Sequence, residues 1–113
     1  MTINEYQKAA LRTANGMSHK NILDKIMNGA LGFTGESGEV ADMLKKNGYQ
    51  GHALDTEHVA KEPGDIAWYI AFIADALGCD LEAVLQMNVD KLRKRYPEGF
   101  SEGGSIHREN GDV

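Results

Sequence analysis

The fold is decided by the stretch Glu62-Pro63-Gly64-Asp65-Ile66-Ala67-Trp68-Tyr69-Ile70-Ala71-Phe72-Ile73-Ala74. From Ile66 onward it is apolar on almost every side, which is typical of a buried helix. Asp55 or Thr56 can cap the start of this helix, and Gly78 can end it. The stretch therefore predicts a helix over about residues 55–78.

Three further helices are predicted around this one, and no strand pattern competes with them. Thr2 followed by Glu5 is a capping box that starts a helix over about residues 3–14. Ser18 is expected to cap a second helix over about residues 19–47, with Gly48 as its stop. Asp80 is expected to cap a fourth helix that ends near residue 96, just before Pro97. The pattern predicts an all-α, four-helix domain.

The second predicted helix contains four glycines, each three residues after the one before. Glycine costs about 1 kcal/mol relative to alanine inside a helix. Residues three apart share a face of the helix, so we interpret these glycines as sites where a neighbouring helix approaches closely. A break near Gly32 is the alternative. The glycines are Gly29, Gly32, Gly35 and Gly38.

Length and composition fit one small soluble domain. The chain has 113 residues and a net charge of -5, which argues against binding a nucleic-acid polymer. Its single cysteine, Cys79, cannot form an internal disulfide and is interpreted as a buried thiol. No signal peptide or bilayer-length apolar run is apparent, so we expect a cytoplasmic protein. We expect the domain to span residues 1–100 and residues 101–113 to be a mobile tail.

Two pairs of acidic residues carry the functional signal. Glu36 and Glu39 are three apart, as are Glu62 and Asp65, so each pair can offer two carboxylates to one point. An isolated pair of this kind is usually a solvated acidic face. Here the flanking residues are apolar, and buried carboxylates need protons or cations to offset a repulsion of about 4 kcal/mol per close pair. Oxygen ligands favour Mg²⁺, with Mn²⁺ as a possible substitute.

The fourth predicted helix offers groups that suit a phosphate. Asn88 interrupts an apolar stripe, and Lys91 and Arg95 follow at spacings of three and four. The alternative is a structural amide with two exposed cations. A metal cluster that faces an amide and cations suits a polyphosphate.

The remaining candidates favour structural roles. Trp68 and Phe72 are expected in the core or an interface, and the apolar segment 66–74 predicts a homodimer or homotetramer. The last turn of the second helix is expected to carry Lys45 and Lys46. No histidine lies three residues from any of the four carboxylates of the two acidic pairs. The four histidines are expected at the surface: His19, His52, His58 and His107.

Three blocks of the sequence, in this order, resemble the MazG-like all-α nucleotide pyrophosphohydrolases, a superfamily that includes dimeric dUTPases and phosphoribosyl-ATP pyrophosphohydrolase. They are residues 32–39 (GFTGESGE), 64–69 (GDIAWY) and 88–100 (NVDKLRKRYPEGF). The family usually has leucine where this chain has Pro63. Proline inside a helix costs about 3 kcal/mol, whereas at its first position it costs little, so the placement of Glu62 is the one most affected.

The resemblance implies a four-helix bundle whose metal is held by Glu36, Glu39, Glu62 and Asp65. It also implies attack of a metal-activated water on the α-phosphate of a nucleoside triphosphate, giving a monophosphate and pyrophosphate. Glu36 or Glu39 would act as general base. Asn88, Lys91, Tyr69 and Arg95 would contact the substrate.

The sequence is compatible with three functions. The first is a house-cleaning or nucleotide-pool enzyme that acts on a (deoxy)nucleoside triphosphate. The second is a specialist for dUTP and dUDP or for phosphoribosyl-ATP. The third is a non-catalytic helical interaction module in which the metal is only a structural clamp.

Overall fold

Thr2 starts the first helix as the capping box predicts. Its Oγ1 accepts a hydrogen bond from the Glu5 amide at 3.1 Å, and the Glu5 carboxylate accepts one from the Thr2 amide at 2.6 Å. The computed structural model describes all 113 residues and contains no β-strand, which confirms the all-α class. The first helix, α1 (Ile3–Ala10), continues into a 3₁₀ turn, η1 (Leu11–Thr13), and a second turn, η2 (Asn15–Met17), follows.

The second helix, α2 (Ile22–Tyr49), begins later and ends later than predicted. Ser18 has helical backbone angles, whereas an N-cap needs an extended backbone, so it cannot cap. Asn21 caps instead, with its side chain accepting from the Asp24 amide at 2.8 Å. The helix runs through Gly48, and the left-handed turn falls at Gly51, where φ is +71°. One helical glycine costs too little to stop a helix.

The third helix, α3 (Thr56–Ala76), is capped by Asp55, which accepts from the His58 amide at 2.9 Å. Pro63 lies inside this helix, not at its first position. Gly78 follows its end with φ +71°, as predicted for a C-terminal glycine. Cys79 is exposed, which corrects the expected buried thiol.

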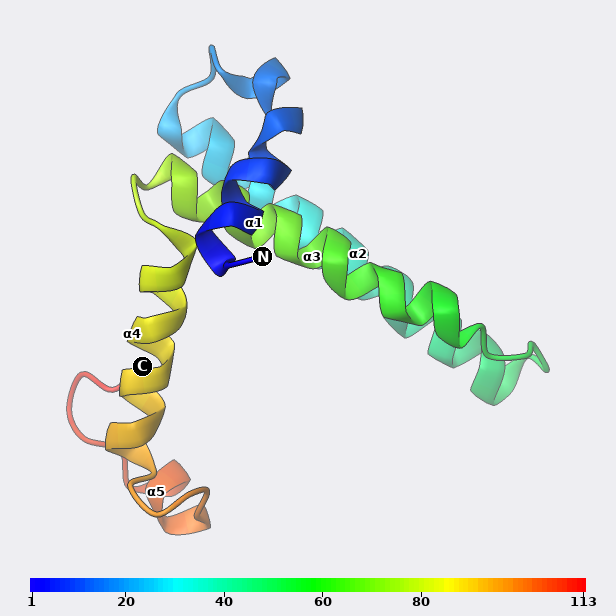
Figure 1. Cartoon of the computed structure of the whole chain (residues 1–113). Coiled ribbons are helices and arrows are strands. Elements are labelled where there is room, and N and C mark those ends of the chain that lie inside the picture. Colours follow the sequence, from blue (N-terminus) through cyan, green and yellow to red (C-terminus); the bar gives the residue numbers. More distant parts are fainter. The chain divides into compact units, whose positions relative to one another are not determined.

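Helices α2 and α3 lie side by side along much of their length (Figure 1). The close approach predicted from the glycines is confirmed at two of the four. A side chain at Gly29 would collide with Ile73, and one at Gly32 would collide with Tyr69. Gly35 and Gly38 face open space, and α2 is not broken at Gly32.

A buried glutamine joins α1 to the end of α3. The Gln7 side-chain amide donates to the carbonyl oxygens of Ala71 and Cys79 at 3.3 and 3.2 Å, and its oxygen accepts from the Leu81 amide at 2.8 Å. Trp68 also reaches α1, donating from Nε1 to the Ala10 carbonyl oxygen at 2.9 Å. The best-buried apolar side chains are Ala71, Phe72, Ala74 and Leu81.

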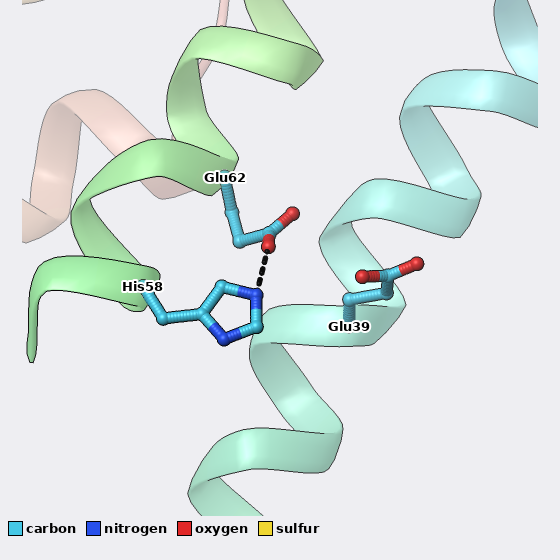
Figure 2. Close-up of side chains that lie close together, drawn as sticks. All are labelled: Glu39, His58 and Glu62. Atoms are coloured by element: carbon cyan, nitrogen blue, oxygen red, sulfur yellow. Dashed lines mark ion pairs between the residues drawn. The ribbon is translucent and has the colours of Figure 1, made fainter. Parts of the chain in front are cut away.

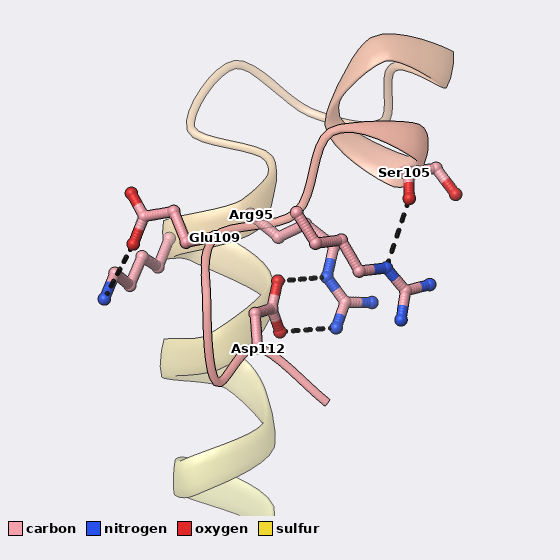
Figure 3. A network of polar contacts seen from close by, with 6 residues as sticks. Arg95, Ser105, Glu109 and Asp112 are labelled. Atoms are coloured by element: carbon pink, nitrogen blue, oxygen red, sulfur yellow. Dashed lines mark hydrogen bonds and ion pairs between the residues drawn. The ribbon is translucent and has the colours of Figure 1, made fainter.

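The chain forms two compact units, Met1–Leu81 and Glu82–Val113. The helix α4 (Leu81–Arg95) ends before Pro97, as predicted, and the short helix α5 (Glu102–Ile106) follows. Within the second unit, the Arg95 guanidinium binds both carboxylate oxygens of Asp112, at 2.8 and 2.6 Å (Figure 3). Lys94 pairs with Glu109 at 3.1 Å, so α4 and the last residues of the chain are tied by two ion pairs. None of the helices is both long and apolar enough to cross a bilayer.

Candidate metal centre

Helices α2 and α3 bring three of the four predicted carboxylates to one point. One oxygen from each of Glu36, Glu62 and Asp65 lies within 4.8 Å of the others. Glu62 and Asp65 share a face because they are three residues apart on α3, and the neighbouring helix supplies Glu36. The burial of the three decreases from Glu62 through Glu36 to Asp65, so the cluster extends from the interior to the surface.

Glu62 is the buried member of this cluster, with only 4% of its surface exposed. Its Oε1 accepts from His58 Nε2 at 3.0 Å, whereas its Oε2 is buried with no hydrogen-bond partner. A buried carboxylate oxygen without a partner is costly unless a proton or a cation binds it. The residues present therefore fit a divalent cation, and an all-oxygen donor set suits a hard ion such as Mg²⁺.

Mutual repulsion acts on the cluster in the absence of a cation. Desolvation, followed by the negative charges of Glu39, Asp65 and Glu62, raises the pKa of the Glu36 carboxyl above its ordinary value. A cation would offset the same repulsion.

Glu39 belongs to a second group, with His58 and Glu62, whose ligand atoms also lie within 4.8 Å of one another (Figure 2). Sequence reasoning missed His58 as a possible ligand. Its imidazole is half exposed, as expected for a surface residue, yet it points at Glu62. The signal was its position four residues before Glu62, which places both side chains on one face of α3.

An open hollow of about 350 Å³ lies beside this second group. Asp42 at its edge holds Lys45 at 2.8 Å and Lys46 at 2.6 Å. Hydrogen bonds from these two lysines lower the pKa of Asp42 to about 2. The lining residues are Gly35, Gly38, Glu39, Asp42, Met43, Lys46 and His58.

The predicted substrate contacts differ in their surroundings. The Tyr69 ring is half buried over Gly32, one turn after Asp65. Asn88 and Lys91 are exposed on α4. Leu85 and Leu92 of the apolar stripe that Asn88 interrupts are themselves about 40% exposed. Arg95 is held by Asp112, whose hydrogen bonds raise the pKa of the guanidinium.

The all-α fold and the acidic residues on the packed helices α2 and α3 place this chain among helical proteins suited to binding a divalent cation. Comparison with known families is more specific. Residues 25–100 match the model of the MazG nucleotide pyrophosphohydrolase domain, and the chain belongs to this family. The predicted resemblance and MazG-like all-α fold are thereby confirmed, and nucleotide pyrophosphohydrolase activity in general is supported.

One curated relative is the Gene 37 protein of Mycobacterium phage L5, which is 31% identical over 114 residues. The match covers 96% of this chain and the whole of the relative. No solved structure gives a significant match.

Proposed function

We propose that this protein is a Mg²⁺-dependent hydrolase that converts a (deoxy)nucleoside triphosphate to the monophosphate and pyrophosphate, as a nucleotide-pool house-cleaning enzyme. The observation that carries the proposal is the buried, unpartnered Oε2 of Glu62 beside the carboxylates of Glu36 and Asp65. Membership of the MazG family adds the pyrophosphohydrolase class to this cation-binding arrangement.

Four side chains are proposed to hold the ion: Glu36, Glu39, Glu62 and Asp65. When bound, a divalent cation lowers the pKa of water and offsets the negative charge of the phosphates. Mn²⁺ is a reasonable substitute because it accepts the same oxygen ligands.

The protein's own residues are assigned three tasks. Glu36 or Glu39 accepts the proton of the attacking water, since both stand on α2 at the edge of the carboxylate group. Asn88, Lys91 and Arg95 are proposed to bind substrate oxygens. Tyr69 is proposed to touch the sugar or the base.

We also propose a homodimer or homotetramer. The segment 66–74, which suggested self-association, is partly buried by α1 and α2, but α2 displays its own apolar stripe. Leu23, Met27 and Leu31 are spaced four apart and are 68%, 55% and 70% exposed. Burying such a stripe against a second copy would remove it from water. Light scattering at micromolar concentration tests this proposal, and a monomer would contradict it.

The function is tested by incubating the full chain with Mg²⁺ and a panel of canonical and modified triphosphates in H₂¹⁸O. We expect pyrophosphate and a monophosphate that carries the ¹⁸O, because the water attacks the α-phosphate. Release of orthophosphate would contradict the proposed bond. Turnover restricted to dUTP and dUDP, or to phosphoribosyl-ATP, would identify a specialist, and no turnover with any member would favour a non-catalytic module.

A further inference from the structure

We propose that Glu39, His58 and Glu62 form a second cation position, with mixed nitrogen and oxygen donors, that takes a transition-metal dication such as Mn²⁺. This inference rests on the proposed function because Glu39 and Glu62 belong to the proposed metal centre. It adds His58 as a ligand and divides the centre into two positions that share Glu62.

The spacing of the donor atoms fits a shared ion. His58 Nε2 and Glu62 Oε1 are 3.0 Å apart, and the Glu39 carboxylate lies within 4.8 Å of both. Two donors that each lie about 2.1 Å from an ion and subtend a right angle at it are about 3.0 Å apart. The observed separation of the two atoms therefore equals one edge of an octahedral coordination sphere, in which an ion would replace the hydrogen between His58 Nε2 and Glu62 Oε1.

Glu62 is suited to serve two positions. Its Oε1 faces the His58 ring, and its other oxygen points away from that ring (Figure 2). This second oxygen, Oε2, is the buried atom without a partner. A carboxylate can bind a different ion through each oxygen, and paired ions in hydrolytic enzymes lie about 3.5–4 Å apart.

The charges of the site also call for more than one dication. Glu36, Glu39, Glu62 and Asp65 contribute four negative charges when ionised, so a single dication leaves two uncompensated before any phosphate arrives. On α2, Asp42 pairs with both Lys45 and Lys46, so these three residues keep one net positive charge and do not offset the two negative charges that remain.

The imidazole nitrogen decides which metal this position takes. Mg²⁺ prefers oxygen ligands, whereas first-row transition metals also accept imidazole. The position is accessible, since Glu39 and His58 both line the open hollow. We therefore expect this position to discriminate against Mg²⁺ and the all-oxygen group of Glu36, Glu62 and Asp65 to accept it.

The test uses the full chain and Mn²⁺ without nucleotide. Electron paramagnetic resonance counts the bound ions, and its pulsed form detects a ¹⁴N nucleus in the first coordination sphere. The variant is His58→Gln, which keeps a side-chain donor that can reach Glu62 but lacks the imidazole nitrogen. His19→Gln is the matched control, because His19 is exposed and outside both groups.

We expect two Mn²⁺ ions per chain and a ¹⁴N coupling in the parent protein and in His19→Gln. In His58→Gln we expect one ion and no coupling. Absence of the coupling in the parent, or its persistence in His58→Gln, would overturn the inference. A chain that shows the coupling but hydrolyses no nucleotide would refute the proposed function alone, whereas turnover with a single all-oxygen ion would refute the second position alone.

Discussion

The ring of Tyr69 on α3 occupies the space that a side chain at Gly32 on α2 would need. The contact joins two of the blocks that carry the family resemblance, and it lies one helical turn beyond Asp65. The closeness of the two helices at the metal centre therefore depends on a glycine at this position.

Replacing Gly32 with alanine should destabilise the protein by about 1–3 kcal/mol, because the added methyl group displaces the Tyr69 ring. Gly35→Ala is the matched control, since nothing lies near that position and alanine is the better helix former. It should stabilise α2 by up to about 1 kcal/mol. Urea unfolding of both variants checks this, and equal effects of the two substitutions would contradict the close approach.

Asp65→Asn should abolish turnover and weaken Mg²⁺ binding without lowering the stability of the metal-free protein. Removing one of several crowded negative charges relieves repulsion, and Asp65 is exposed. A saturating ligand at 100 times its Kd adds about 2.7 kcal/mol of stability, and the variant should lose most of this increment. Melting temperatures with and without Mg²⁺ measure it. A metal-independent loss of stability would indicate a structural acid instead.

Gln7→Leu should cost about 1–3 kcal/mol, because it removes three hydrogen bonds and leaves the Leu81 amide without its acceptor. Gln86→Leu is the control, since Gln86 is exposed and bonds only to the Asp90 side chain. That change should alter stability by less than about 0.5 kcal/mol. Chemical denaturation of the two variants tests the difference. An unchanged free energy of unfolding in Gln7→Leu would show that the hydrogen bonds of Gln7 do not stabilise the core.

Asn88→Ala should leave stability within about 0.5 kcal/mol of the parent, because Asn88 is exposed. If Asn88 binds the substrate, kcat/KM should fall at least tenfold, or about 1.4 kcal/mol. Lys91→Met should act in the same way. Mg²⁺ affinity without nucleotide should not change in either variant. Unchanged kcat/KM with the preferred triphosphate would end the assignment of both residues.

The link between Arg95 and Asp112 should be lost in acid. Hydrogen bonds from Arg95 lower the pKa of Asp112 below its ordinary value of 3.8. A carboxyl whose pKa is lowered by folding stabilises the folded state above its unfolded pKa, and this contribution disappears as the pH falls through the folded value. Carbon NMR titration of Asp112 should give a midpoint below 3.8, and Arg95→Leu should return it toward that value. An unshifted midpoint in the parent would show that the link does not form in solution.

Much of the fold follows from the sequence alone, because local chemistry dictates it. The capping box at Thr2, the caps at Asp55 and Gly78, and the stop before Pro97 each depend on neighbouring residues only. The apolar segment 66–74 and the acidic pairs depend on helical spacing, which is fixed by the geometry of the helix. These features were sufficient to predict an all-α protein, and the resemblance of the blocks at residues 32–39, 64–69 and 88–100 indicated the MazG family.

Tertiary structure decided what depends on contacts between distant residues. Only packing distinguishes Gly29 and Gly32, which meet side chains of α3, from Gly35 and Gly38, which do not. Burial singles out Glu62 among the four acids, since its depth depends on the helices around it. His58 had the spacing of a ligand in the sequence, but its orientation toward Glu62 and the proximity of Glu39 required α2 and α3 to be placed side by side. Spacing along one helix limits which side chains can meet, and the packing of two helices selects those that do.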